Sequence, residues 1–189
     1  MVGTLDRSQK EVEQRAIALQ DRICAASCPM PDSPKALLAE LRNRLALAWR
    51  DGLLVTPEHE VRALLKHEAS KLDTEVILGG TKDFARTSEA GWFRRHDDAL
   101  FNFAVTVRRE RDSLALLAYN FELRFPTGMT PGFVRFDLNT PDHANQDRGM
   151  RCHLHPGNDD LQIPSPLMAP IEILELILYR CDLPAKLRK

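Results

Sequence analysis

Several features that would assign this chain to a familiar class are scarce or missing. The sequence has four cysteines among 189 residues, too few for a secreted disulfide scaffold, and no repeated C-x-x-C pair of the kind that builds zinc fingers. No run of about 18 apolar residues occurs and the first ten residues are polar, so we expect no membrane span and no signal peptide. The expected location is therefore the cytoplasm.

Signature motifs of the large enzyme classes are also missing. The chain has no G-x-x-x-x-G-K-[ST] phosphate loop, no G-x-G-x-x-G dinucleotide loop, no H-E-x-x-H helix and no G-x-S-x-G turn. A dominant charge sign is absent as well, because the formal net charge is -1. No overall field attracts nucleic acid or an anionic membrane, so any RNA contact must use a local patch.

What the chain does contain is the composition of an ordinary folded protein, with 43% hydrophobic and 28% charged residues. Residues 1–75 are predicted to form a helical N-terminal segment with about three helices. The first covers about residues 5–26, the second is capped by Asp32 or Ser33, and the third begins at Thr56 and extends to Ser70 or Leu72. The second helix is predicted to bury Leu37, Leu38, Leu41, Leu45 and Trp49.

Residues 76–98 have little regular pattern and are predicted to be a linker or an irregular functional loop. In residues 99–189, alternation of apolar and polar side chains predicts strands over about 100–109, 114–125, 133–138 and 151–155. A short fifth strand at 161–163 and a helix from Met168 or Pro170 to about Arg180 follow. The predicted fold class is α+β, with about three N-terminal helices, then a four- to five-stranded antiparallel meander sheet packed by a C-terminal helix.

The densest chemistry lies between Gly132 and Pro156. His153 and His155 are two residues apart, so on a strand they share one face, and Arg135, Asp137 and Asn139 share a face of the preceding strand. If these strands pair in register, one histidine can act as a base and the other as an acid without a metal, while arginine holds a phosphate.

The same residues allow other interpretations. H-x-H with His143 or Asp137 is a common metal-ligand arrangement, and Cys24 with Cys28 could supply further ligands, although core thiols on a helix explain that pair more simply. The two histidines could also be polar sheet residues hydrogen-bonded to Asp137 and Asp142. We expect no cofactor and no bound metal.

The C-terminal half resembles the TumE-like small toxins of bacterial toxin–antitoxin pairs. The similarity covers about residues 98–180: a strand hairpin, an R-F-D-x-N motif, a loop with Pro and His, a strand ending in H-x-H, and a helix after prolines. The matching positions are Arg135, Asp137, Asn139, His143, His153 and His155. The resemblance implies a compact α+β domain that stops growth by acting on RNA.

The predicted function is therefore that of a toxin-like or defence-associated protein acting on RNA, as a metal-independent ribonuclease. His153 and His155 are the predicted acid and base, with Asp137 orienting one of them. Arg135 and Arg151 are predicted to hold phosphate, together with Asn139 and His143 in the substrate site. The alternative is a non-enzymatic interaction subunit whose N-terminal helices bind a partner protein, such as an antitoxin.

Overall fold

The computed structural model of the chain describes residues 30–69, 73–81, 86, 88–111, 113–143 and 149–181. The predicted helix over residues 5–26 lies outside them. The described helices are α2 (Pro34–Arg50), α3 (Glu58–Leu64) and α4 (Pro170–Tyr179). The strands are β1 (Leu65–Ala69), β2 (Thr74–Gly79), β3 (Phe93–Arg94), β4 (Leu100–Arg109), β5 (Leu114–Arg124), β6 (Phe133–Leu138), β7 (Cys152–Pro156) and β8 (Ile163–Pro164).

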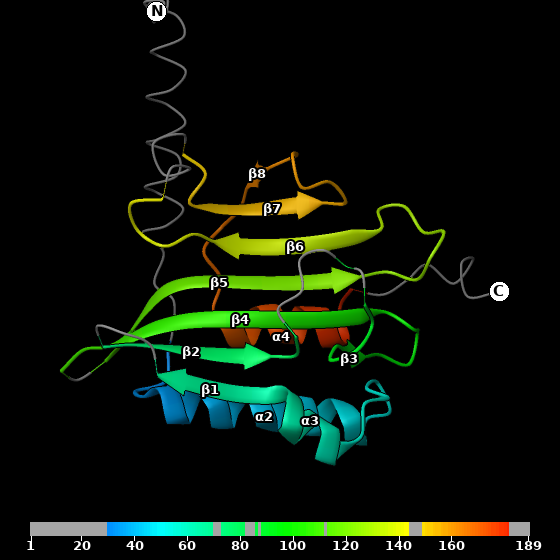
Figure 1. Cartoon of the computed structure of the whole chain (residues 1–189), viewed down its shortest axis with the longest axis horizontal. Helices are drawn as coiled ribbons and strands as arrows, with labels where there is room; N and C mark the ends of the chain where they lie inside the picture. The colour runs from blue at the N-terminus through cyan, green and yellow to red at the C-terminus, as the bar shows by residue number, and fades with distance from the viewer. Residues whose placement is uncertain are drawn as a thin grey trace, which may run out of the picture.

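All strands of the described residues join one eight-stranded antiparallel sheet (Figure 1). Its order is β1-β2-β4-β5-β6-β7-β8, and β3 also pairs with β4. From β4 to β8 the neighbours in the sheet are neighbours in the sequence, as expected for a meander of hairpins. No helix within the described ranges is both long and apolar enough to cross a membrane.

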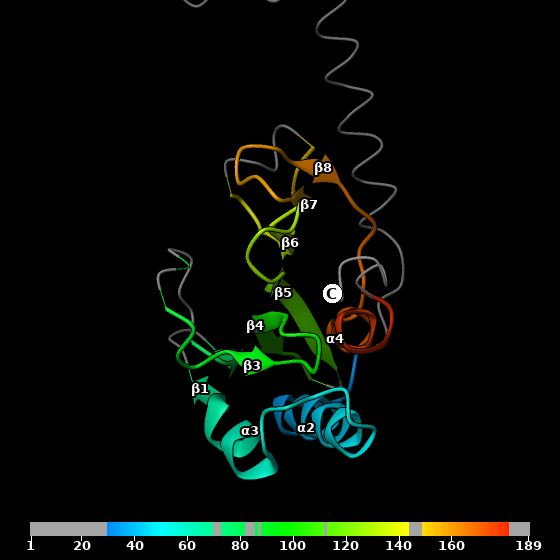
Figure 2. The same cartoon turned by 90° about the vertical axis from the view of Figure 1, so that its right-hand side faces the viewer.

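The two faces of the sheet differ because side chains alternate along each strand. One face carries Phe101 and Phe103 of β4 and Phe121 of β5, none more than 3% exposed. Helices α2 and α4 pack on this side and complete the hydrophobic core (Figure 2). The opposite, polar face carries Glu122 of β5 and Asp137 of β6, and it holds the candidate site.

The predicted fold class is wrong in two respects: the sheet is larger than predicted, and the helices are not mainly N-terminal. The sheet has eight strands rather than four or five, and strands predominate after residue 60. Helix α3 ends at Leu64, and the chain continues as β1, which pairs antiparallel with β2. Four of the five β1 residues are exposed, so the sequence of this strand shows no alternation of apolar and polar residues. Backbone pairing with β2 makes these residues a strand.

The expected linker over residues 76–98 contributes to the sheet. The expected boundary between residues 75 and 76 falls inside β2, which pairs with β4. Gly79 lies opposite Phe103, and a Cβ at this position would be 2.2 Å from the Phe103 ring. The apolar run before Gly79 is therefore a strand that packs closely on the core.

The start of α2 follows the prediction, because the Oγ of Ser33 accepts the backbone N–H of Ala36 at 3.2 Å. Its buried stripe differs from the prediction at two positions: Leu38 is only partly buried, and Trp49 is 42% exposed while Ala48 takes the core position with 0% exposure. The predicted start of α3 at Thr56 is also wrong: Thr56 Oγ1 accepts the backbone N–H of Arg94 at 2.7 Å, and Pro57 occupies the N-cap position before Glu58.

Candidate functional site

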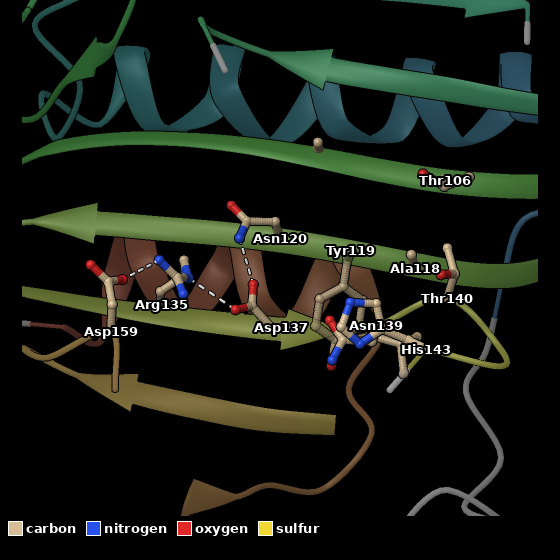
Figure 3. Close-up of a pocket in the computed structure, with 12 residues that line it drawn as sticks. Thr106, Ala118, Tyr119, Asn120, Arg135, Asp137, Asn139, Thr140, His143 and Asp159 are labelled. Atoms are coloured by element: carbon tan, nitrogen blue, oxygen red, sulfur yellow. Dashed lines mark hydrogen bonds and ion pairs between the residues drawn. The ribbon is translucent and has the colours of Figure 1, made fainter. Parts of the chain in front are cut away.

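A pocket of about 550 Å³ opens on the face of the sheet opposite α2 and α4. Strands β4, β5 and β6 form its floor, and the chain after β6 forms one end (Figure 3). Four predicted site residues line it: Arg135, Asp137, Asn139 and His143. Arg151, His153 and His155 are not among the described residues that line it.

The pairing of β6 with β7 brings the two predicted histidines to Asp137. Arg135 lies opposite His155, and Asp137 lies opposite His153. The Nε2 atoms of the two imidazoles are 3.0 Å apart, and the Oδ2 atom of Asp137 lies 3.2 Å from Nε2 of His155 and 3.7 Å from Nε2 of His153. We call Asp137, His153 and His155 the Asp–His cluster.

The Asp–His cluster is buried, although it lies on the polar face as the alternation predicts. Each histidine is 2% exposed and Asp137 is 7% exposed. Nδ1 of His155 donates to the backbone carbonyl of Asn158 at 3.3 Å, because a carbonyl can only accept. Asp137 is the member of the cluster that reaches the pocket.

Arg135 connects the cluster to a closed ring of alternating charges. Its Nε donates to Asp137 Oδ2 at 2.9 Å, and its Nη1 contacts Asp159 at 2.5 Å and Glu122 at 3.8 Å. Arg86 closes the ring, with contacts of 2.7 Å to Glu122 and 2.8 Å to Asp159. We call Arg86, Glu122, Arg135 and Asp159 the charge ring; part of it is drawn in Figure 3.

The environment shifts the ionisation of several of these groups. Burial alone would raise the pKa of Asp137, but the hydrogen bond from His155 and the charge of Arg135 outweigh it and lower the pKa. Burial lowers the pKa of His153, because imidazolium is less stable away from water. The hydrogen bond from Arg86 lowers the pKa of Asp159. Near neutral pH both carboxylates are ionised, and His153 favours its neutral form.

Four residues of the site are missing from the sequence-based prediction: Arg86, Asn120, Glu122 and Asp159. Asn120 and Glu122 had a signal, since they alternate with the core residues of β5 and pair with Asp137 and Arg135 of β6. Asn120 Nδ2 donates to Asp137 Oδ1 at 2.5 Å. Arg86 and Asp159 lie in irregular segments where no periodic pattern distinguishes them.

Arg151 and Arg135 are the two predicted phosphate ligands, but the guanidinium of Arg151 contacts backbone carbonyls, whereas that of Arg135 contacts carboxylates. Nε of Arg151 donates to the backbone carbonyl of Asn139 at 3.2 Å, and its Nη2 donates to that of Leu117 at 3.5 Å. These contacts tie the start of β7 to β5 and to the end of β6. Arg151 therefore contacts the backbone of Asn139, a residue of the pocket lining, but does not itself line the pocket as Arg135 does.

Among the described residues, Asp137, His153 and His155 are also the group whose side chains could together hold a metal ion, with ligand atoms within 4.8 Å of one another. The site thus offers two kinds of chemistry, proton transfer and metal coordination, from the same three side chains. Comparison with known proteins adds no assignment: no protein-family model matches the chain, and no curated protein or solved structure gives a significant match.

Proposed function

We propose that this protein is a toxin-like or defence-associated protein that acts on RNA, with the pocket as its substrate site and the Asp–His cluster as its reaction centre. The observation that carries the proposal is the register of β6 and β7, which places Nε2 of His155 3.2 Å from the carboxylate of Asp137, a residue that also lines the pocket. The resemblance of residues 98–180 to small bacterial toxins supports the choice of RNA as substrate.

The short distances within the cluster favour acid–base chemistry in which Asp137, His153 and His155 act together, rather than one in which the two histidines act separately. With their Nε2 atoms 3.0 Å apart, the rings leave no space for a phosphodiester between them. An acid and a base on opposite sides of a scissile phosphate are therefore incompatible with this arrangement. The cluster instead acts from one side of the substrate and transfers a proton through Asp137, its member at the pocket.

Substrate binding uses the pocket residues that carry donors. Arg135 is 12% exposed in its side chain, and Asn139 and His143 line the other end of the pocket (Figure 3). Guanidinium and imidazole groups are suitable partners for phosphate oxygens. The carboxylates of the charge ring offset the charge of Arg135, so we expect binding to depend on shape and hydrogen bonds as well as on charge.

The test is cleavage of a labelled single-stranded RNA by the purified full chain, alongside growth of cells in which its expression is induced. We expect wild type to cleave RNA and slow growth, and Asp137→Asn and His155→Ala each to lower cleavage at least 100-fold, the size typical of a lost acid–base group. The matched control is His67→Ala, which removes another histidine in contact with a carboxylate, Glu75, but far from the pocket in the β1–β2 hairpin.

Circular dichroism and thermal unfolding of each variant separate loss of chemistry from loss of fold. A DNA oligonucleotide of the same sequence tests whether the 2′-hydroxyl is required. If wild type neither cleaves RNA nor slows growth, or if both cluster variants retain full activity, the cluster is not a ribonuclease centre.

The alternative, a non-enzymatic interaction subunit, has one supporting observation. Leu47 and Trp49 at the end of α2 and Val55 shortly after it are 44%, 42% and 54% exposed, and exposed apolar side chains close in sequence are typical of protein contacts. An inactive but growth-neutral protein whose Trp49→Ala variant loses a co-purifying partner would favour this function instead.

A further inference from the structure

The centre of the Asp–His cluster is a point where three electron-pair donors meet. Asn158 accepts a hydrogen bond from Nδ1 of His155, so in the neutral ring Nε2 carries a lone pair directed at the cluster. The Oδ2 atom of Asp137, 3.2 Å away, is also an acceptor. Two lone pairs at this distance repel each other unless a proton or a cation lies between them.

The spacing of the three donor atoms matches the coordination sphere of a small divalent ion. A metal–ligand bond of about 2.0–2.1 Å places tetrahedral ligands about 3.3 Å apart and neighbouring octahedral ligands about 3 Å apart. The measured separations are 3.0, 3.2 and 3.7 Å. The two rings meet edge to face at 69°, so both Nε2 atoms can point to one centre without stacking.

We propose that the Asp–His cluster binds one divalent transition-metal ion through Nε2 of His153, Nε2 of His155 and Oδ2 of Asp137. Two imidazoles and one carboxylate form a donor set that suits Zn²⁺ and its neighbours in the first transition row. The inference is independent of the RNA substrate, but it changes how the proposed centre works, because the ion takes the place of the shared proton.

The surroundings of the three side chains have the features of a supported metal site. The carbonyl of Asn158 holds the outer nitrogen of His155, a common device that orients a ligating imidazole. Asn120 and Arg135 hold Asp137 through Oδ1 at 2.5 Å and Oδ2 at 2.9 Å. Nδ1 of His153 is buried and has no partner with good hydrogen-bond geometry among the described residues, but the backbone of Met150 lies close enough to oppose the lowering of the pKa of this ring by burial. A proton on Nδ1, directed at that backbone, leaves the lone pair on Nε2.

Within the part of the chain that the structure describes, Arg135 is the cation in direct contact with a proposed ligand, Asp137, and its charge is already offset. Its guanidinium contacts Asp159 at 2.5 Å and Glu122 at 3.8 Å, in addition to Asp137. Of the three proposed ligands, Asp137 is the one that lines the pocket, so an ion would reach the cluster from the side of this carboxylate.

The test begins with the full chain freed of metal by dialysis against a chelator, followed by calorimetric titration with Zn²⁺. We expect one equivalent per chain, and a rise in Tm of about 5–10 °C when free Zn²⁺ exceeds Kd a hundredfold. Asp137→Asn and His155→Gln should each weaken binding at least tenfold, whereas His67→Ala should leave it unchanged. If Asp137→Asn and His155→Gln each still bind one equivalent of Zn²⁺ with the wild-type affinity, the proposal is wrong.

Two further measurements identify the ligands without relying on variants that could fail to fold. In ¹⁵N-histidine NMR spectra, Zn²⁺ should shift the Nε2 resonances of His153 and His155 and leave those of His59 and His67 in place. Co²⁺ should give visible absorption without a strong sulfur-to-metal band. Such a band would place the ion on thiolates, including Cys24 and Cys28, and contradict the assignment.

Activity measured with and without chelator keeps this proposal separate from the ribonuclease. Cleavage by metal-free protein that binds no Zn²⁺ would support a proton-based centre and refute the metal site. One equivalent of Zn²⁺ bound by Nε2 of both histidines in a protein that cleaves no RNA would establish the metal site and refute the ribonuclease.

Discussion

Arg95 provides the clearest test of how the hydrophobic layer of this protein is held together. It is 2% exposed and lies in the β3–β4 connection, within the segment expected to be a linker. Its Nε and Nη2 atoms donate to the two oxygens of Asp97 at 3.1 and 2.7 Å, and Nη1 donates to the backbone carbonyl of Ile177. That carbonyl belongs to the last turn of α4, where carbonyls lack a partner within the helix.

We expect Arg95→Met to destabilise the protein by about 3–5 kcal/mol. Methionine replaces the apolar stem of arginine but leaves Asp97, whose side chain is 4% exposed, as an unpaired buried charge. Removing one partner of a buried ion pair typically costs about this amount. Since 1 kcal/mol changes Tm by about 2–4 °C in a chain of this size, Tm should fall by about 6–20 °C.

Urea unfolding monitored by tryptophan fluorescence and by circular dichroism measures the change. Arg94→Met is the matched control, because the neighbouring Arg94 pairs with exposed Glu89 and Asp98 at the surface and should cost less than about 1 kcal/mol. Adding Asp97→Asn to Arg95→Met should recover part of the loss by removing the unpaired charge. A loss in Arg95→Met no larger than in Arg94→Met would refute the buried-pair argument.

Two further predictions concern the segment after β7. The hydrogen bond from Arg86 lowers the pKa of Asp159 in the folded protein. The ionised Asp159 therefore stabilises the fold above the unfolded pKa of about 3.9, and this stabilisation is lost as the pH falls below that value. When Tm is measured from pH 7 to pH 3, Asp159→Asn should lose less stability than wild type. Gly157→Ala should destabilise the fold by about 1–3 kcal/mol, because Gly157 has a φ of 84° and an added Cβ would lie 2.6 Å from Cβ of Pro131. Chemical denaturation measures this loss, and Gly128→Ala, with positive φ but no atom within 4 Å of the added Cβ, separates contact from backbone strain.

The strands from β4 to β7 could be predicted because their alternation is strong. From Phe101 to Val107 of β4 and from Tyr119 to Leu123 of β5, every second residue is a buried apolar side chain on the face of α2 and α4. Short connections make adjacent strands pair. β1 and β2 could not be predicted in the same way. β1 is an exposed edge strand that continues directly from α3. Its sequence therefore shows neither the alternation of a half-buried strand nor the 3.6-residue apolar repeat of a helix.

The candidate site, too, could be predicted only in part from the sequence. That His153 and His155 share a face with each other, and Arg135 with Asp137, follows from the period of a strand. That His155 lies opposite Arg135 depends on the register of β6 and β7, which a loop of undefined pattern between them does not reveal. Nor does local sequence indicate that Arg86 and Asp159, 73 residues apart, share a bidentate ion pair.

By itself, the sequence determined which residues form the central strands and the last helix, and which side chains of those strands face away from the core. These properties depend on local periodicity, which is written along the chain. Only the tertiary structure decided that the sheet has eight strands, that the two histidines are buried rather than open to solvent, and that their Nε2 atoms converge on Asp137. Register and burial arise from segments distant in sequence, and the chemistry of the Asp–His cluster depends on both.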